Sequence, residues 1–463
     1  MREHTGILII LLLALIVRVV LYLILNVNNS PGSDFYLHIF SPLNDANGYH
    51  QLALNILNTS SFSGNSPVYI FDFFTLDSVR TPGYPVFLAF IYLLFGVSPS
   101  LVIIFQIALN LASIYLVYSI AAKLFSNKNI ALISAFLFSL DIYTLFFIFE
   151  LYTETLFVFT LLFSTVLFIK SINSHGFLHL IISGILIGLS ALIRPIAIFL
   201  PIVYIAIIFF FDKHSVSLKF FKTGVLSISF LLIISLWMMR NYNEYSHFGF
   251  STISSVNLYL FNAAITKSNS TDKNTQQIIN EFKNIAINAG ASKQNNAFDN
   301  AEIFKMLGKE YIKTNKLLFI KQHFLGMLNM YLSIGHRQLL NRLGFATSEG
   351  GKKYSQSNLR RLLNNSTNME IVFAFWLIAF LIFCYVFASY GIFSMLKTKE
   401  YFSIFLLLGL IFYFTFLTGV GGSPRFRIPV VPFYSMLAGY GFVKLLKLNF
   451  QTKVIKFVIQ SRK

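Results

Sequence analysis

Long apolar runs are the feature that most constrains the fold of this chain. Residues 6–26 form an apolar run that contains a single charge, Arg18, and runs of similar length recur along the sequence. A helix needs about 20 predominantly apolar residues to cross the hydrocarbon core of a bilayer. Only 12% of the residues are charged, against about 25% in soluble domains. The sequence therefore predicts an all-α polytopic membrane protein.

Ten crossings are expected, and an eleventh apolar segment is too short to be one. The crossings are predicted at 6–26, 99–122, 129–149, 154–170, 177–193, 195–211, 220–239, 370–396, 401–419 and 428–446. Residues 85–97 would rise only about 20 Å as a helix, whereas the hydrocarbon core is about 30 Å thick. This segment is expected to lie at the membrane interface.

The distribution of basic residues orients these helices. A net charge of +18 would suit a nucleic-acid partner, but lysines and arginines gather in short loops, as the positive-inside rule describes. No nucleic-acid partner is therefore expected. With the N-terminus inside, the inside loops contain Lys123, Lys128, Lys170, Lys213, Lys219, Lys222, Lys397 and Lys399. Counting 85–97 as a crossing would turn the basic loops that follow it outward.

This topology divides the chain into three parts. Residues 1–239 form an N-terminal transmembrane module whose first outer loop is 27–98. Residues 240–369 form a largely polar extracytoplasmic segment, with an amphipathic interfacial helix near 316–335. Residues 370–463 contain the last transmembrane helices and a basic cytoplasmic tail.

Acidic residues stand out in the outer segments. Asp45 in NDANGYHQLALNIL would lie at the N-terminal end of a helix, where the dipole favours a carboxylate, although a simple helix cap is the plainer interpretation. Tyr49 shares its face. Glu150 and Glu154 are four residues apart, so one helical face can carry both. A solvated helix start, or a cation or substrate between the two carboxylates, would explain this pair.

Arginines also appear outside, against the usual bias. Arg80 lies in VRTPGYP, Arg194 in ALIRPIAIFLP, and Arg425 and Arg427 in GGSPRFRIPVVP. Topology does not require them, and a guanidinium group binds phosphate through two parallel hydrogen bonds. One such arginine alone would be explained by contact with lipid headgroups. Four of them near an outer acid favour a phosphate-binding pocket.

Ionisable residues also occur within predicted crossings. Arg18 and Asp141 are candidates for function by their depth in the membrane, or for a packing pair. The role of each is left open.

In their order along the chain, these motifs resemble the GT-C superfamily of integral-membrane glycosyltransferases. The relevant branch contains the protein O-mannosyltransferases and the lipid A aminoarabinose transferase. The resemblance covers most of residues 6–446 and includes ELYTETLFVFTLLFS and WMMRNY besides the stretches above. It implies a GT-C-type bundle of about 10–11 transmembrane helices with outer interfacial helices, and sugar transfer from a polyprenyl-phosphate carrier with inversion at the anomeric carbon.

The resemblance also implies roles for the outer residues. The implied catalytic residues are Asp45 and Glu154. The implied donor phosphate-binding residues are Arg80, Arg425, Arg427 and, more loosely, Arg194. Candidates for lining the substrate cavity are Tyr49, His50 and Glu150. Some members of the family need a divalent cation and others do not. If one is used here, Asp45, Glu150 and Glu154 are the candidate ligands.

The expected partners follow from this reaction. They are a polyprenyl-phosphate sugar donor, a glycan, lipid or protein acceptor, and membrane lipid. The protein is expected in the cell membrane, with its active site on the extracytoplasmic face. One alternative is a lipid-linked sugar transporter or flippase, which would be expected to contain inverted repeats. Another is a polymerase or ligase that uses diphosphate-linked oligosaccharide, which would not need the early Asp45 segment.

Overall fold

A computed structural model describes residues 5–30, 33–39, 45–64, 69–70, 72–172, 176–343 and 368–446. Within these ranges the chain is almost entirely helical. The sheet structure is limited there to two short antiparallel strands, β1 (Tyr69–Ile70) and β2 (Phe74–Thr75), with Tyr69 opposite Thr75. The prediction of an all-α polytopic membrane protein is confirmed.

Each expected crossing coincides with a helix in the structure. Six are long and apolar enough to span a bilayer: α1 (Thr5–Ile24), α6 (Pro99–Phe125), α9 (Glu154–Ser171), α12 (Val216–Tyr245), α20 (Asn368–Lys397) and η4 (Pro424–Val430) with α22 (Val431–Leu446). A bent seventh consists of α7 (Lys128–Ser139), α8 (Ile142–Phe146) and η1 (Phe147–Phe149). Three shorter apolar segments are α10 (Phe177–Ile193), η2 (Pro195–Phe199) with α11 (Leu200–Phe211), and α21 (Tyr401–Leu417).

The bent span explains why two ionisable residues lie at membrane depth. α7 and α8 meet at 59°, which leaves backbone groups at the break without helical partners. Asp141 caps α8 by accepting a hydrogen bond from the backbone N–H of Thr144 (2.8 Å). Arg18 donates to the carbonyl of Ser139 (3.2 Å) and to Asn110 (3.0 Å). Of the readings left open for Arg18 and Asp141, the structure supports a packing role, although each has its own partners.

Helices α20 and α22 pack with their backbones in contact. A Cβ atom at Gly441 would lie 1.9 Å from the carbonyl oxygen of Phe387, and one at Gly391 would lie 2.2 Å from that of Leu437. Lipid supplies no hydrophobic force between helices, so close approach at small residues stabilises their association. The two glycines thus fix α22, which continues directly from the arginine-containing η4.

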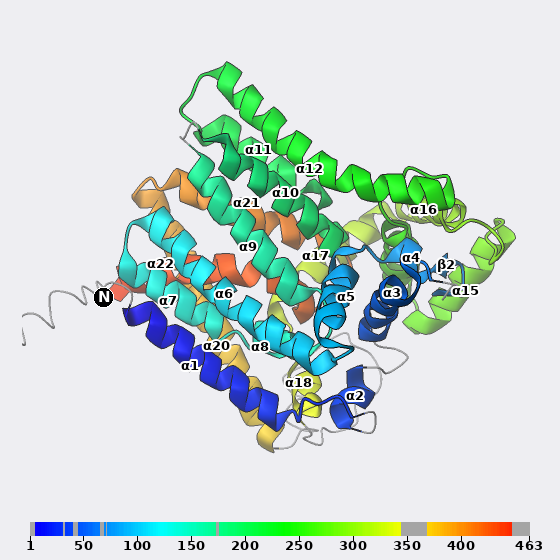
Figure 1. Ribbon diagram of the computed structural model, residues 1–463, viewed down its shortest axis with the longest axis horizontal. Helices are drawn as coiled ribbons and strands as arrows, with labels where there is room; N and C mark the ends of the chain where they lie inside the picture. The colour runs from blue at the N-terminus through cyan, green and yellow to red at the C-terminus, as the bar shows by residue number, and fades with distance from the viewer. Residues whose placement is uncertain are drawn as a thin grey trace, which may run out of the picture.

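The short helices gather at one end of the bundle (Figure 1). From residues 27–98, the predicted first outer loop, these are α2 (Asp34–Ile39), α3 (Asp45–Thr59), α4 (Leu76–Val79) and α5 (Gly83–Phe95). From residues 240–369 they are α13 (Ile253–Val256), the π-helix η3 (Asn257–Ala263), α14 (Ala264–Ser268), α15 (Thr275–Asn288), α16 (Ala297–Thr314), α17 (Lys316–Leu332) and α18 (His336–Arg342). We call this the loop end.

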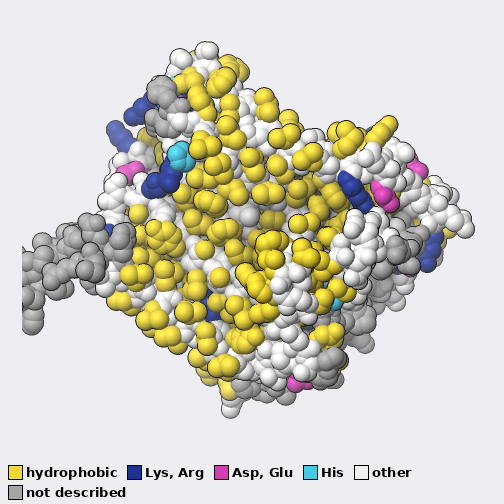
Figure 2. Space-filling view, in the orientation of Figure 1, with side chains coloured by type: hydrophobic (Ala, Val, Ile, Leu, Met, Phe, Trp, Pro, Cys, Tyr) yellow, Lys and Arg dark blue, Asp and Glu magenta, His cyan; other side chains and the backbone are white. Residues whose placement is uncertain are grey.

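Surface polarity agrees with a membrane-embedded bundle. Hydrophobic side chains cover the middle of the face in Figure 2, and most of the visible charged side chains lie near its left and right ends. The predicted interfacial segments both form helices, α5 and α17. Each exposes large apolar side chains, such as Leu93 at 71% and Leu317 at 83%, as a helix lying against lipid does.

The contact between α20 and α22 generates a stability prediction. Gly441→Leu should lower the free energy of unfolding by about 1–3 kcal/mol, because the added side chain forces the two backbones apart. Gly224→Leu in α12 is the matched control, since a Cβ there meets no atom within 4 Å. Thermal unfolding of the detergent-purified variants measures both. Equal unfolding temperatures would contradict the packing described.

Candidate active site

Five charged side chains from four distant segments meet at the loop end. Asp45 lies 2.5 Å from Arg80 and 3.1 Å from Arg425. Glu154 lies 2.5 Å from the Nε atom of Arg425 and 2.6 Å from Arg194. Arg425 therefore bridges the two carboxylates, and Arg80 and Arg194 lie at the two ends. We call these five residues the charge network.

Helix ends place these groups with favourable polarity. Asp45 and Glu154 are the first residues of α3 and α9, and Arg194 is the C-cap residue of α10. A carboxylate at a helix N-terminus and a guanidinium at a C-terminus each interact favourably with the helix dipole. Pro195 follows Arg194 and begins η2, so the chain leaves α10 at the point where Arg194 reaches Glu154.

A glycine allows two of these segments to approach each other. A Cβ atom at Gly83, the first residue of α5, would lie 2.7 Å from the backbone nitrogen of Ile193. The N-terminus of α5 therefore contacts the C-terminus of α10 backbone to backbone. This contact brings Arg80, three residues before Gly83, to the same region as Arg194.

Aromatic rings surround the arginines. The Arg425 guanidinium lies 4.2 Å from the ring centroid of Tyr152, and that of Arg80 lies 5.0 Å from the ring of Tyr49. The Tyr49 hydroxyl also accepts a hydrogen bond from Arg80 (3.3 Å). Such rings stabilise a cation without neutralising it. The arginines thus keep their charge available for an anion.

Electrostatics keep Asp45 ionised. Burial alone would raise its pKa, but Arg80 and Arg425 outweigh burial and lower the pKa from 3.8 to about 2. The side chain is still one-third exposed. A carboxylate that is both ionised and accessible can accept a proton from a bound group.

Arg427 does not join the charge network, although sequence reasoning grouped it with Arg425. It is 2% exposed, and it donates hydrogen bonds to the carbonyls of Met330 (3.3 Å), Tyr331 (3.2 Å) and Ser333 (3.3 Å) at the end of α17. In this structure Arg427 satisfies helix-terminal carbonyls. It lacks the accessibility that a donor phosphate would need.

Glu150 belongs to a neighbouring cluster. Its carboxylate lies 2.9 Å from His38 and 3.2 Å from Arg342. Sequence reasoning missed His38 and Arg342. Arg342 comes from the polar segment 240–369, and its distance along the chain from Glu150 gives no indication that the two residues are in contact. Glu150 and Glu154 therefore face different partners despite their helical spacing, because the chain between η1 and α9 is not helical.

His50 contacts Tyr92 of α5. It is 7% exposed, and its Nδ1 atom lies 3.0 Å from the hydroxyl of Tyr92. Burial lowers the pKa of His50 to about 4. The imidazole is therefore neutral at physiological pH, and the structure does not bring it to Asp45.

The candidate metal ligands do not converge. Asp45 and Glu154 face guanidinium groups, and Glu150 lies in the neighbouring cluster. Across the described ranges, no three His, Cys, Asp or Glu side chains are grouped so as to hold a metal ion. Binding of a divalent cation by these residues stays a prediction.

Comparisons with known proteins bear on the fold and on the class of protein that this chain resembles. Residues 79–239, which include Arg80, Glu154 and Arg194, match the family model described as dolichyl-phosphate-mannose-protein mannosyltransferase. No curated protein matches the chain.

Solved structures also show similarity. The apo oligosaccharyltransferase of Archaeoglobus fulgidus matches with a TM-score of 0.51 and a sequence identity of 14%. The match covers 98% of this chain and 52% of the oligosaccharyltransferase chain. The same organism's oligosaccharyltransferase tethered to an acceptor peptide containing an NVT sequon has a TM-score of 0.50 at 13% identity, with 95% and 50% covered. This chain thus spans about half the length of the structures it matches.

The fold and the matched family define the class of protein. Both the family and the structural neighbours are glycosyltransferases of the GT-C type. The resemblance drawn from the sequence motifs is thereby confirmed as a similarity, and the chain is an integral membrane protein.

The separate roles of the two neighbouring arginines generate a prediction. Arg427→Met should lower the free energy of unfolding by about 3 kcal/mol, because three carbonyls at the end of α17 lose a charged donor. Arg425→Met should lower the free energy of unfolding by less, since Asp45 still has Arg80 as an ion-pair partner and Glu154 still has Arg194. Denaturant or thermal unfolding in detergent compares the two. A greater loss for Arg425→Met would contradict the assignment.

Proposed function

We propose that this protein transfers a sugar from a polyprenyl-phosphate donor to an acceptor at the extracytoplasmic face of the cell membrane, with inversion at the anomeric carbon. The observation that carries the proposal is the charge network, which places an accessible carboxylate, Asp45, beside the guanidinium groups of Arg80 and Arg425. The description of the matched family, which specifies a dolichyl-phosphate-linked sugar, supports the class of donor.

In this reaction Asp45 is the general base. It takes the proton from the acceptor's hydroxyl or amine as that oxygen or nitrogen bonds to the anomeric carbon. The bond from that carbon to the phosphate oxygen breaks, and polyprenyl phosphate leaves. Negative charge grows on the phosphate as the bond breaks, so Arg80 and Arg425 stabilise the transition state more than the ground state. Glu154 orients Arg425 and Arg194.

The charge balance favours a monophosphate donor over a diphosphate one. The network contains three guanidinium groups and two carboxylates, which leaves one positive charge. A polyprenyl-phosphate sugar is a phosphodiester with one negative charge. In addition, the Nε atom of Arg80 is buried and has no hydrogen-bond partner in the described structure. A phosphate oxygen would satisfy this donor.

An apolar pocket suits the lipid tail of such a donor. It has a volume of about 410 Å³ and lies between α11 and α21, with Phe199, Val203, Gly409 and Phe416 in its wall. Phe199 comes five residues after Arg194 along the chain. Tyr413, also in the wall, donates a hydrogen bond to the carbonyl of Ile196 and thereby ties η2 to α21. These links to η2, which follows Arg194, support a lipid tail in this pocket with its phosphate at the arginines.

Removing the base tests the proposal. Asp45→Asn should leave folding intact and lower the transfer rate by about 100-fold or more, because general-base catalysis typically contributes 10²–10⁴-fold. Asp72→Asn, in the same loop and 69% exposed, is the control. The readout is release of polyprenyl phosphate from a panel of polyprenyl-phosphate sugars, with membranes of cells lacking the protein as the acceptor source. Release of polyprenyl phosphate at the parental rate by Asp45→Asn would contradict the proposal.

The low pKa of Asp45 generates a pH prediction. The base acts when ionised, so the rate falls as pH drops through its pKa. Arg80→Ala removes the nearer cation, which should raise that pKa by about one unit or more and move the acid limb of kcat/KM for the donor to higher pH. Lys305→Ala, a lysine of α16 paired with Glu302, should leave the limb in place. If the acid limb of the kcat/KM profile stays at the same pH in Arg80→Ala, a group other than Asp45 is responsible for it.

A further inference from the structure

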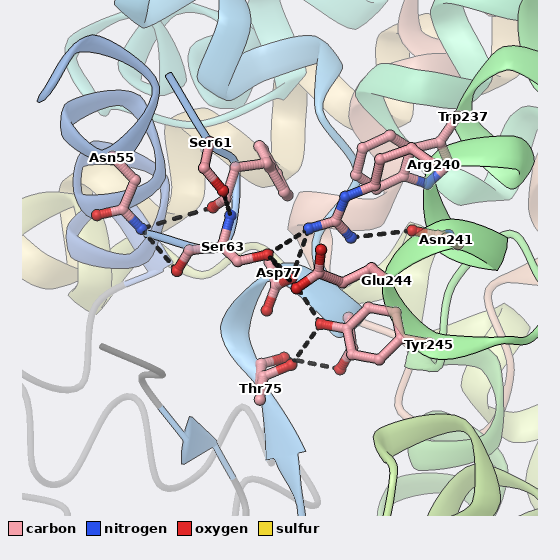
Figure 3. Close-up of polar contacts among 12 residues, drawn as sticks. Asn55, Ser61, Ser63, Thr75, Asp77, Trp237, Arg240, Asn241, Glu244 and Tyr245 are labelled. Atoms are coloured by element: carbon pink, nitrogen blue, oxygen red, sulfur yellow. Dashed lines mark hydrogen bonds and ion pairs between the residues drawn. The ribbon is translucent and has the colours of Figure 1, made fainter. Parts of the chain in front are cut away.

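A second buried polar cluster lies beside Arg80, and the proposed reaction does not use it. Its centre is Asp77 in α4, whose side chain is 6% exposed. One carboxylate oxygen, Oδ2, accepts hydrogen bonds from Arg240 (2.7 Å), Tyr245 (2.5 Å) and Ser63 (2.9 Å). In Figure 3, Arg240 and Tyr245 reach toward Asp77 from α12, and Ser63 reaches it from the first outer loop.

Arg240 is held firmly in this cluster. Its guanidinium lies 5.0 Å from the ring of Trp237 and 5.5 Å from that of Phe62, and it donates to Asn241 (3.0 Å). It also donates to Ser63 (2.6 Å). Burial would raise the pKa of Asp77, but the hydrogen bonds from Tyr245 and Arg240 lower it. Asp77 is thus ionised, and its hydrogen bonds tie α12 and the loop together at this point.

The cluster controls the backbone that carries Arg80. α4 has only four residues, too few to be stable as an isolated helix, and Arg80 is its C-cap residue. Hydrogen bonds to the backbone also hold α4 in place, because the carbonyls of Ser78 and Val79, the two residues before Arg80, both accept one. Thr252 donates its backbone N–H to Ser78 (3.0 Å), and the Ser251 hydroxyl donates to Val79 (2.7 Å). The whole turn is therefore fixed against α12 and the segment that follows it.

The Arg80 side chain itself has few contacts that would hold it in place. Its hydrogen bonds in the described structure go to Asp45 and to the Tyr49 hydroxyl. Asp45 is the very group that the reaction needs free to accept a proton. When Arg80 turns toward a phosphate, its position depends on the backbone of α4.

We infer that Asp77 and Arg240 are positioning residues that hold α4 so that the Arg80 guanidinium faces the donor phosphate. We call this pair the Asp77–Arg240 clamp. The inference rests on the proposed function, since it assigns Arg80 to the donor. Removing one partner of a buried ion pair also lowers stability, so the clamp is recognised by an effect on donor binding that depends on Arg80.

Asp77→Asn in the full-length protein tests the clamp, because the amide keeps the size of the side chain and removes its charge. The measurement is equilibrium binding of undecaprenyl phosphate to the purified protein in detergent. We expect the Kd to rise about 10-fold, within the range of coupling between contacting residues. The donor KM should rise with it, while the acceptor KM changes by less than about two-fold.

A double-mutant cycle separates positioning from general destabilisation. If Asp77 acts through Arg80, Asp77→Asn should have no further effect on the Kd in an Arg80→Ala background. Lys283→Met is the matched control, since it breaks a 2.7 Å ion pair of the same outer loop, with Asp72, that does not involve α4. It should keep the parental Kd. Tyr245→Phe removes one of the three hydrogen bonds to Asp77 and should raise the Kd by about 2- to 3-fold, which tests the clamp if Asp77→Asn does not fold.

Three results would overturn the clamp. The first is a parental Kd in Asp77→Asn, or in Tyr245→Phe where Asp77→Asn does not fold. The second is that Asp77→Asn raises the Kd by the same factor in the Arg80→Ala background as in the parental protein. The third is that Lys283→Met raises the Kd as much as Asp77→Asn does. A parental protein that does not bind undecaprenyl phosphate would instead reject the donor class in the proposed function, and the clamp's role in donor binding with it. Parental binding that Asp77→Asn leaves unchanged rejects the clamp alone.

Discussion

Two carboxylates at the edge of a membrane bundle can stay ionised only if cations lie against them, and the structure of the loop end depends on this requirement. Glu154 is 1% exposed, and an unpaired charge at such a site would cost several kcal/mol. Arg425 and Arg194 supply its partners, while Arg80 and Arg425 supply those of Asp45. Removing any one arginine leaves each carboxylate with at least one partner. Because of this redundancy, a substrate can bind one arginine while each carboxylate keeps a cationic partner.

The transmembrane helices serve this arrangement by where they end or bend. The 59° bend between α7 and α8 redirects the chain toward Tyr152, whose ring lies against Arg425. Gln106 then holds the stretch after the bend by donating to the carbonyls of Ile148 (2.7 Å) and Glu150 (2.8 Å). On the other side, the loop before Arg425 packs on α17 so closely that a Cβ at Gly422 would lie 1.8 Å from the carbonyl of Gly326. Backbone contacts thus bring these segments together, and the ion pairs form between the side chains that they carry.

Sequence patterns were sufficient for the helices and for the members of the charge network, but not for all partners. Apolar length and basic loops locate the crossings because lipid thickness and charge asymmetry act on every segment separately. Arg427 was grouped with Arg425 because two arginines separated by one residue look alike in sequence. In η4 the two side chains nevertheless reach different partners. The pairing of Glu150 with Arg342, and of Asp77 with Arg240, joins residues more than 160 positions apart, and no local pattern encodes such contacts.

The resting arrangement also bears on how the proposed reaction would begin. Both carboxylate oxygens of Asp45 are engaged, Oδ1 by Arg80 and Oδ2 by Arg425, and with a pKa of about 2 the group is a weak base. A phosphodiester bound between the same two guanidinium groups draws hydrogen bonds away from Asp45 and adds a negative charge nearby. Both changes raise the pKa of a carboxylate. The donor would therefore increase the basicity of Asp45 on arrival, so that proton transfer from the acceptor becomes favourable only when a phosphate is present to leave.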